Sequence, residues 1–211
     1  MNEMKICELF RSIQGEGLII GSLTFFVRVS GCNLNCKWCD TRYSKTEKGT
    51  DMSVDEIAEE AGGIRDICIT GGEPLLQDEV YELMDAFLER NKRIVLETNG
   101  SIDISRVKKN QNLIISMDIK CPSSGMEDHM LLSNMDLLKP TDQLKFVIDD
   151  GGDLEYALLL LERKPVKCEV IFCPVGGMDI EPVAEEIIER KLNVRVLPQL
   201  HKMIWGNRRS V

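Results

Sequence analysis

Short apolar runs, separated by amphipathic helical patterns, constrain the fold of this chain more than any other feature. Seven short blocks are rich in Val, Ile, Leu and Phe, and all are far too short to span a membrane. Unbroken apolar blocks of this length are typical of parallel strands that are covered on both faces. Their alternation with helices predicts a parallel α/β fold. The blocks are Thr24–Ser30, Asp66–Thr70, Arg93–Glu97, Leu113–Asp118, Gln143–Ile148, Lys167–Phe172 and Asn193–Leu197.

Four amphipathic stripes predict helices between these strands. Ser53 and Glu56 form a capping box at the start of the first stripe, and the other three cover Val80–Leu88, Leu154–Leu161 and Val183–Ile188. The link from Glu97 to Leu113 holds at most a short helical pattern, over Ile104–Lys109. Because such links are too short for full crossover helices, we expect an incomplete, TIM-like barrel with few covering helices. In barrels of this type, the chemistry lies on the loops that follow the strands.

Length and charge limit the function classes. A prior of about 150 residues per domain makes residues 1–211 a single domain. The net charge is −9 and the Lys and Arg residues are scattered, so the chain lacks the basic patch of a nucleic-acid-binding protein. No apolar run approaches membrane-spanning length, and the first residues do not resemble a signal peptide. We therefore expect a cytoplasmic protein with no membrane or nucleic-acid partner.

Cys32, Cys36 and Cys39 have the spacing C-x3-C-x2-C directly after the first predicted strand. Three thiolates on one loop can bind three irons of a [4Fe–4S] cluster and leave the fourth iron open to another ligand. A zinc-binding or electron-transfer module is the non-enzymatic alternative, but it would need a fourth protein ligand, which this loop lacks. His129, expected at the surface, and His201 have no partner at ligand spacing. The remaining cysteines are widely spread and fit small buried apolar residues better than a second cluster.

Polar loops follow the next three predicted strands. Thr70-Gly71-Gly72-Glu73-Pro74 combines glycines, which let the backbone approach a ligand closely, with a carboxylate that can accept from an ammonium group. The other two loops begin Glu97-Thr98-Asn99-Gly100 and Asp118-Ile119-Lys120. A plain turn or strand-end loop is the alternative in each case. Because all of these loops follow strands downstream of the cysteines, the sequence predicts one active site there.

The cysteine motif, with Trp38 before Cys39, and the Gly-Gly-Glu-Pro element resemble the radical S-adenosylmethionine (radical SAM) superfamily. Within it, the chain resembles the 7-carboxy-7-deazaguanine synthase family over essentially its whole length. That narrower resemblance rests on Phe10–Gly17, Arg28, the Cys39-Asp40-Thr41 loop and the tail Leu197–Gly206. The chain departs from the pattern at Asp118-Ile119-Lys120, where many relatives have Ser-Pro-Lys.

The resemblance implies a radical SAM fold and a carbon–nitrogen lyase of deazapurine biosynthesis, of the queuosine or archaeosine type. A [4Fe–4S] cluster and S-adenosyl-L-methionine would generate a radical that takes hydrogen from C6 of 6-carboxy-5,6,7,8-tetrahydropterin. Ring contraction with loss of ammonia would then give 7-carboxy-7-deazaguanine. The resemblance further implies Mg²⁺, a reductant such as flavodoxin or ferredoxin, and a homodimer. A glycyl-radical-enzyme activase, which acts on a protein, is the alternative that shares the cluster and Gly-Gly-Glu-Pro motifs.

Site residues follow from the same resemblance. The N-terminal segment, about residues 1–23, and the C-terminal tail, about residues 198–211, would help to bind substrate. Arg28 would bind the substrate carboxylate, because a charge in an apolar strand is costly without a partner; a nearby acid is the alternative partner. Thr41 would bind Mg²⁺, a cation that prefers oxygen, unless its hydroxyl caps a turn. Cofactor contacts would come from Trp38, Cys39, Asp40, Gly71, Gly72, Glu73, Gly100, Asp118, Ile119 and Lys120, and substrate contacts from Ile13, Gln14, Gly15, Glu16, Arg28, Thr98 and His201.

Overall fold

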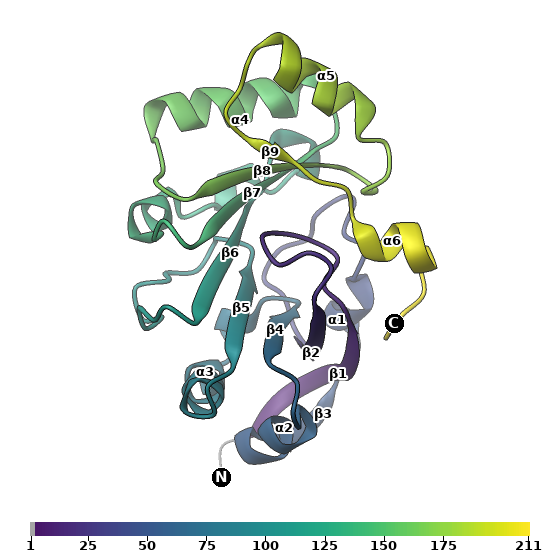
Figure 1. Cartoon of the computed structure of the whole chain (residues 1–211), viewed down its shortest axis with the longest axis vertical. Helices are drawn as coiled ribbons and strands as arrows, with labels where there is room; N and C mark the ends of the chain where they lie inside the picture. Colours follow the sequence, from purple (N-terminus) through teal and green to yellow (C-terminus); the bar gives the residue numbers. More distant parts are fainter. Residues whose placement is uncertain (1–2) are drawn as a thin grey trace.

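A computed structural model describes residues 3–211 and places one nine-stranded sheet in them, in the order β3-β1-β2-β4-β5-β6-β7-β8-β9. Strands β2 and β4 to β9 are parallel, while β1 is antiparallel to both β2 and β3. The sheet curves into an open arc (Figure 1), which confirms the predicted incomplete barrel. The strands are β1 (Glu3–Ile13), β2 (Leu23–Val29), β3 (Thr50–Ser53), β4 (Asp66–Gly71), β5 (Arg93–Thr98), β6 (Leu113–Ile119), β7 (Gln143–Ile148), β8 (Glu169–Pro174) and β9 (Arg195–Val196).

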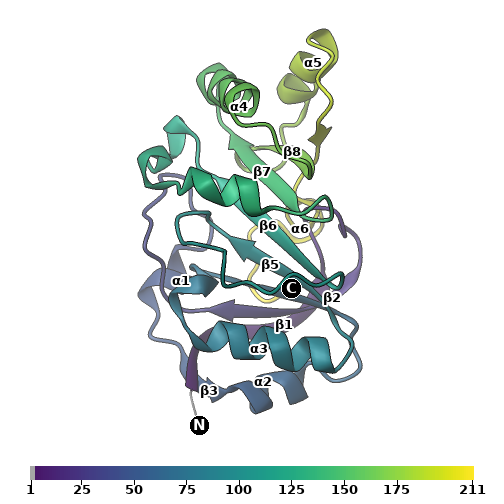
Figure 2. The same cartoon turned by 90° about the vertical axis from the view of Figure 1, so that its left-hand side faces the viewer.

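The long helices cover only the outer, convex face of the sheet (Figure 2). Four of them correspond to the predicted amphipathic stripes, and Ser53 and Glu56 form the predicted capping box at the start of α2. Between Glu97 and Leu113, residues 104–109 form a turn and a bend but no helix, in line with the expectation that this link is too short for a crossover helix. The helices are α1 (Arg42–Thr46), α2 (Val54–Glu60), α3 (Glu79–Glu89), α4 (Gly151–Arg163), α5 (Glu181–Glu189) and α6 (Leu200–Trp205).

The hydrophobic core lies between the sheet and these outer helices. Residues such as Val27, Leu96 and Phe146 point outward from the strands and pack in this core. Alternate positions on the same strands carry Arg28 and Lys145, whose side chains face the concave side and line a cavity. Helices therefore cover one face of the sheet, and the other face lines the cavity. The strands are apolar on one face and partly charged on the other, as their period of two allows.

A β-bulge at Cys7 gives β1 its unusual side-chain pattern. Ile6 pairs with Val29 and Glu8 pairs with Arg28, so one extra residue stands in β1 between these two pairs. A bulge of this kind shifts which side chains face each side of a sheet. Before it, Ile6 packs in the outer core. After it, Phe10, Ser12 and Gln14 face the cavity.

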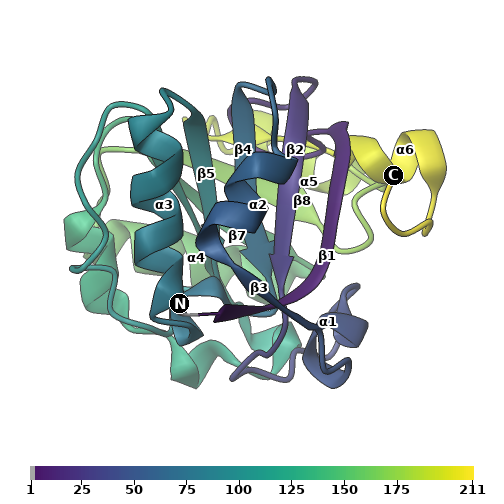
Figure 3. The same cartoon turned by 90° about the horizontal axis from the view of Figure 1, so that it is seen from below.

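The C-terminal segment spans the open side of the arc, between β9 and β1. Leu200 N donates to Gly15 O at 2.9 Å, which holds α6 against the loop after β1. Seen from below, α6 projects beyond the β1 edge of the sheet (Figure 3). None of the helices in residues 3–211 combines the length and the apolar character that a bilayer crossing needs.

Candidate active site

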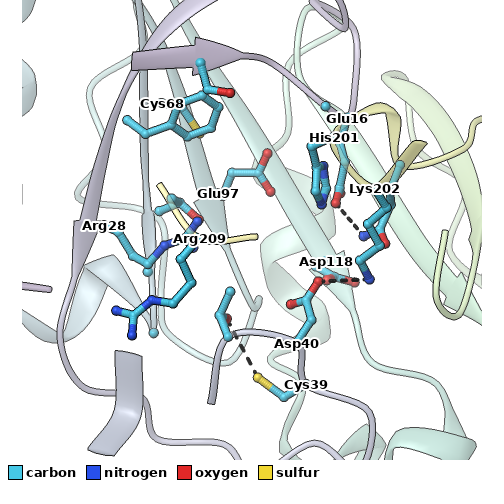
Figure 4. Close-up of a pocket in the computed structure, with 18 of the residues that line it drawn as sticks. Glu16, Arg28, Cys39, Asp40, Cys68, Glu97, Asp118, His201, Lys202 and Arg209 are labelled. Atoms are coloured by element: carbon cyan, nitrogen blue, oxygen red, sulfur yellow. Dashed lines mark hydrogen bonds and ion pairs between the residues drawn. The ribbon is translucent and has the colours of Figure 1, made fainter. Parts of the chain in front are cut away.

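A cavity of about 530 Å³ opens at the carboxyl ends of the parallel strands. Its walls come from β1, β2 and β4 to β7, from the loop that carries the cysteine motif, and from α6 with the residues that follow it. Figure 4 shows Arg28, Glu97 and Asp118 projecting into this space from different strands, with His201 contributed by α6. Segments that are far apart in the sequence therefore meet in one site.

All three motif cysteines, Cys32, Cys36 and Cys39, are half-buried and line this cavity. Their loop is held by neighbours: Asn99 Nδ2 donates to Asn33 Oδ1 at 3.0 Å, and Lys37 N donates to Ser124 O at 3.0 Å. Within residues 3–211, no three His, Cys, Asp or Glu side chains converge tightly enough for one metal ion. Three thiolates that each bind a different iron of a cube do not have to converge on one point, so the loop can hold a cluster.

The Gly-Gly-Glu-Pro loop is packed directly against the start of the cysteine loop. Glu73 N donates to Gly31 O at 2.8 Å, and a Cβ added at Gly72 would lie only 1.8 Å from that same oxygen. Glycine is thus required at position 72 by a close backbone approach. The Gly71 and Gly72 backbone lines the cavity.

The Glu73 side chain points away from the cavity and is fully buried. Its carboxylate accepts from Leu75 N at 3.0 Å, Thr98 Oγ1 at 2.8 Å and Asn99 N at 2.7 Å. Burial raises its pKa, against the hydrogen bonds that lower it. Glu73 thereby ties the loop after β4 to the end of β5. Gly100 and Ile119 also lie outside the lining of the cavity.

Polar groups from the end of β6 lie beside the cysteine loop. Lys120 Nζ forms an ion pair with Asp118 Oδ2 at 2.7 Å and lies 5.5 Å from the centre of the Trp38 ring. The Trp38 Nε1 group donates to Ser123 Oγ at 3.1 Å. The other Asp118 oxygen, Oδ1, is buried and has no hydrogen-bond partner within residues 3–211. Since buried polar atoms are rarely left unpaired, it marks a place for a ligand donor.

On the opposite wall, Lys145 lies between two carboxylates. Its Nζ atom is 2.5 Å from Glu16 Oε2 and 3.3 Å from Glu97 Oε2, and all three side chains are largely buried. Burial opposes the charge on Glu16, but the Lys145 ammonium outweighs it and lowers the Glu16 pKa to about 2. Burial raises the Glu97 pKa, and the nearby Glu16 charge adds to that rise. One ammonium thus keeps the closer carboxylate charged, while the pKa of the farther carboxylate stays raised.

The residues from 13 to 16 form the cavity wall beside this charged group. Gln14 is almost fully buried, and its Nε2 donor has no hydrogen-bond partner in the part of the chain that the structure describes. Glu16 Oε1 accepts from Gln199 Nε2 at 2.6 Å. His201 packs directly on Gly15, where an added Cβ would lie 2.1 Å from Nδ1. Burial lowers the pKa of His201.

Thr41 and Arg28 also line the cavity. Thr41 is the N-cap residue of α1, yet its hydroxyl makes no capping hydrogen bond and lies 3.8 Å from Cys39 Sγ. Arg28 has an acidic partner, because its Nε donates to Glu8 Oε1 at 2.7 Å. The alternative that the sequence left open, an ion pair between Arg28 and a nearby acid, is therefore present. Arg28 still faces the cavity, so it can contact a ligand at the same time.

The structure brings most of the sequence-predicted site residues to one cavity. Among the predicted set, only Glu73, Gly100 and Ile119 do not line it. Sequence reasoning missed Lys145, Gln199 and Lys202. Lys145 carries the same signal as Arg28, a charge inside an apolar strand, whereas Gln199 and Lys202 were covered only by the prediction that the tail as a whole helps to bind substrate. The predicted residues in the lining are Ile13, Gln14, Gly15, Glu16, Arg28, Cys32, Cys36, Trp38, Cys39, Asp40, Thr41, Gly71, Gly72, Thr98, Asp118, Lys120 and His201.

The other five cysteines are free thiols outside the C-x3-C-x2-C motif. Cys68, Cys121, Cys168 and Cys173 are buried, as expected for small apolar residues, and Cys7 is partly exposed. His129 is exposed, which confirms its predicted place at the surface.

Comparison with known proteins identifies the family. The model of the radical SAM superfamily matches residues 26–131. A 7-carboxy-7-deazaguanine synthase of Methanospirillum hungatei is 44% identical over 95% of this chain and 85% of its own length. One of Thermoplasma acidophilum is 37% identical over 97% of this chain and 98% of its own. The fold matches the crystal structure of QueE from Escherichia coli, with a TM-score of 0.76, 24% identity and coverage of 94% of this chain and 95% of that one. Radical SAM enzymes carry a [4Fe–4S] cluster and S-adenosylmethionine, and this chain belongs to the 7-carboxy-7-deazaguanine synthase family among them.

Proposed function

We propose that this enzyme converts 6-carboxy-5,6,7,8-tetrahydropterin to 7-carboxy-7-deazaguanine by radical ring contraction with loss of ammonia. The observation that carries the proposal is one cavity that joins the three cysteines to Gln14, Arg28 and the Glu16–Lys145–Glu97 group. A pterin needs hydrogen bonds along its ring edge and a cation for its carboxylate, and this cavity offers both. The family to which the chain belongs supports the same reaction.

The cofactor would bind on the cysteine side of the cavity. Cys32, Cys36 and Cys39 would hold the [4Fe–4S] cluster, which together with S-adenosylmethionine supplies the radical that abstracts hydrogen. The backbone of Gly71 and Gly72 would receive the amino group of the cofactor, and Asp118 Oδ1 would accept from one of its donors. Glu73 would act through the loop, because its carboxylate is occupied by three donors from the protein.

The substrate would bind on the opposite side. Gln14 Nε2, a buried donor without a partner, would donate to an acceptor on the pterin edge. Glu16 is held as a carboxylate and would accept from pterin N–H groups, with His201 beside it. Thr98 lines the same cavity and would also contact the substrate. The Arg28 guanidinium would bind the pterin carboxylate in a bidentate arrangement. Glu97, whose pKa burial raises, would be placed to exchange a proton with the substrate.

Mg²⁺ would bind at Thr41. The Thr41 hydroxyl is not used as a helix cap and faces the cavity beside Cys39. Mg²⁺ prefers oxygen ligands and often takes one protein group with the rest from substrate and water. After chelator treatment, Thr41→Ala should keep its cluster and bind S-adenosylmethionine but lose most of the Mg²⁺ stimulation of turnover. An unchanged response to Mg²⁺ in this variant would remove Thr41 from the metal site.

The test of the reaction is an anaerobic assay of the reconstituted enzyme with the carboxylated pterin, S-adenosylmethionine and dithionite, read by mass spectrometry. The expected product is 7-carboxy-7-deazaguanine. Cys36→Ala should lack the cluster and abolish cofactor cleavage, whereas Cys168→Ser, at a buried cysteine outside the cavity, should keep both. Cofactor cleavage without any change in the pterin would refute the substrate and reopen the activase alternative.

The remaining partners belong to the same proposal. A one-electron donor such as a flavodoxin or ferredoxin would reduce the cluster in the cytoplasm, and the enzyme would act as a homodimer. Replacing dithionite with each donor in the assay tests the first point, and sedimentation of the anaerobic holoenzyme tests the second.

A further inference from the structure

Glu8 lies behind Arg28, and donors from three separate segments converge on its carboxylate. Arg28 Nε from β2 and Tyr43 Oη from α1 donate to Oε1, at 2.7 and 2.8 Å. Ser210 Oγ from the C-terminal segment donates to Oε2 at 2.6 Å. The Glu8 side chain is only 9% exposed and does not line the cavity. It therefore touches the cavity only through the residues that bind it.

Two contacts fix the orientation of the Arg28 guanidinium. Glu8 binds its Nε edge, and the ring of Phe10 lies 5.7 Å from its central carbon. Phe10 is itself stacked on Phe26, with ring centres 4.8 Å apart. In the described part of the chain, the two terminal nitrogens of Arg28 make no hydrogen bond or ion pair that would compete with a ligand. Those nitrogens form the edge that binds a carboxylate in a bidentate manner.

The bulge at Cys7 is what places Glu8 there. In a strand without a bulge, residues 6 and 8 would face the same side, and Ile6 faces the outer core. The extra residue therefore lets Glu8 lie opposite Arg28 on the other side of the sheet from Ile6. Bulges near active sites commonly re-aim a side chain in this way. The carboxylate stays charged, because hydrogen bonds from Ser210, Tyr43 and Arg28 outweigh the effect of burial and lower the pKa of Glu8. It thus offers Arg28 a fixed negative partner at neutral pH.

We propose that Glu8 is a positioning residue: it fixes the Arg28 guanidinium so that its two terminal nitrogens face the carboxylate of the substrate. This inference rests on the proposed function, in which Arg28 binds that carboxylate. Glu8 acts only through Arg28 and makes no contact with the pterin. Its loss should weaken substrate binding and leave the radical chemistry of bound substrate nearly unchanged.

The experiment compares Glu8→Ala, Glu8→Gln, Arg28→Ala and the double variant. Equilibrium binding of the carboxylated pterin to the cluster-loaded protein is measured together with KM and kcat. Glu8→Ala should raise the pterin Kd and KM by about tenfold or more, with kcat changed less than about threefold. Glu8→Gln keeps an acceptor for Arg28 Nε and should fall between this variant and the parent. The double variant should bind no worse than Arg28→Ala, because coupled residues give non-additive losses.

Two controls separate this role from a general structural one. Glu47→Ala removes the carboxylate that binds Arg209 at 2.9 and 3.0 Å, and so loosens the C-terminal segment without touching Arg28. If Glu47→Ala weakens pterin binding as much as Glu8→Ala does, the effect comes from the C-terminal segment and the inference is overturned. A tetrahydropterin without the 6-carboxylate should bind the parent and Glu8→Ala equally.

The outcomes also separate this inference from the proposed function. If the parent converts the pterin but the losses from Glu8→Ala and Arg28→Ala add, only the inference about Glu8 fails. If Glu8→Ala lowers kcat and leaves the Kd unchanged, the inference fails in the same way. If the parent does not bind or convert the carboxylated pterin, the proposed function fails, and the role of Glu8 toward that carboxylate fails with it.

Discussion

The two walls of the cavity are built in different ways. The cysteine wall consists of loops that lie close together and are joined through backbone atoms, as where Glu73 N and Gly72 contact the Gly31 carbonyl. The substrate wall consists of charged side chains from distant segments, with Lys145 paired to Glu16 across 129 positions in the sequence. One wall therefore depends on close backbone packing, and the other depends on a balance of buried charges.

Different perturbations should damage the two walls. Added volume should disrupt the cysteine wall, because a backbone carbonyl cannot move aside as a flexible side chain can. Removal of a charge, or a change of pH, should disrupt the substrate wall, because a buried ion without its partner is unstable. Three substitutions test this contrast.

Lys145→Met should give the largest effect. It removes the one ammonium that Glu16 and Glu97 share, and loss of one member of a buried ion pair typically costs about 3–5 kcal/mol. The measurement is urea unfolding of the anaerobic holoenzyme at pH 7. Lys164→Met is the matched control, because the ion pair of Lys164 with Asp136 has a similar length of 2.6 Å but is exposed. It should cost less than about 1 kcal/mol. Equal costs for the two variants would contradict the charged character of the substrate wall.

Gly72→Ala should be somewhat less destabilising, at about 3 kcal/mol, the upper end of the usual cost of overpacking. Its new Cβ would lie 1.8 Å from Gly31 O, so the cysteine loop must shift. We expect a lowered iron content together with a lowered unfolding free energy. Gly151→Ala is the control, since a Cβ at the start of α4 meets no atom within 4 Å. A Gly72→Ala protein with full iron content and parental stability would show that this wall tolerates added volume.

His201→Asn should give the smallest effect, seen only as a change in pH dependence. Burial lowers the His201 pKa, so below about pH 6.5 the unfolded chain binds a proton that the folded protein resists. Stability should therefore fall as the pH decreases from 6.5 toward the lowered folded pKa, by at most about 1.4 kcal/mol per pH unit. His201→Asn should flatten this slope, while His129→Asn, at an exposed position, should not. Parallel slopes for all three proteins would count against a buried His201.

The sequence predicted what is encoded locally. The seven parallel strands and four helices follow from periodicity, and the cysteine loop follows from its spacing, because each of these patterns lies within a short window. Strand β1 was missed because the bulge at Cys7 breaks its alternation, so Ile6 and Leu9 face one side although their numbers differ in parity. Strand β3 was missed because its four residues carry no such pattern.

The site was predicted less completely than the fold, for a related reason. Glu73 stands at the expected place in the chain, yet hydrogen bonds to Thr98 and Asn99 turn its side chain away from the cavity. The partnership of Gln199 with Glu16 depends on how α6 folds back onto the loop after β1. Neither the direction of one side chain nor a contact across 183 positions is visible in a local pattern.

The bulge at Cys7 marks the one position of β1 at which the strand tolerates a change of length. The thiol contributes only a 3.6 Å contact with Glu47, so another side chain at position 7 should leave the strand intact. Deleting the residue would make Ile6 and Glu8 consecutive, and consecutive residues of a strand face opposite sides. Ile6 would stay in the outer core, while Glu8 would stay opposite Arg28 and Phe10 at the cavity. Chains that share this site should therefore differ in length at this position, whereas one residue added or lost elsewhere in the strand would exchange its two faces.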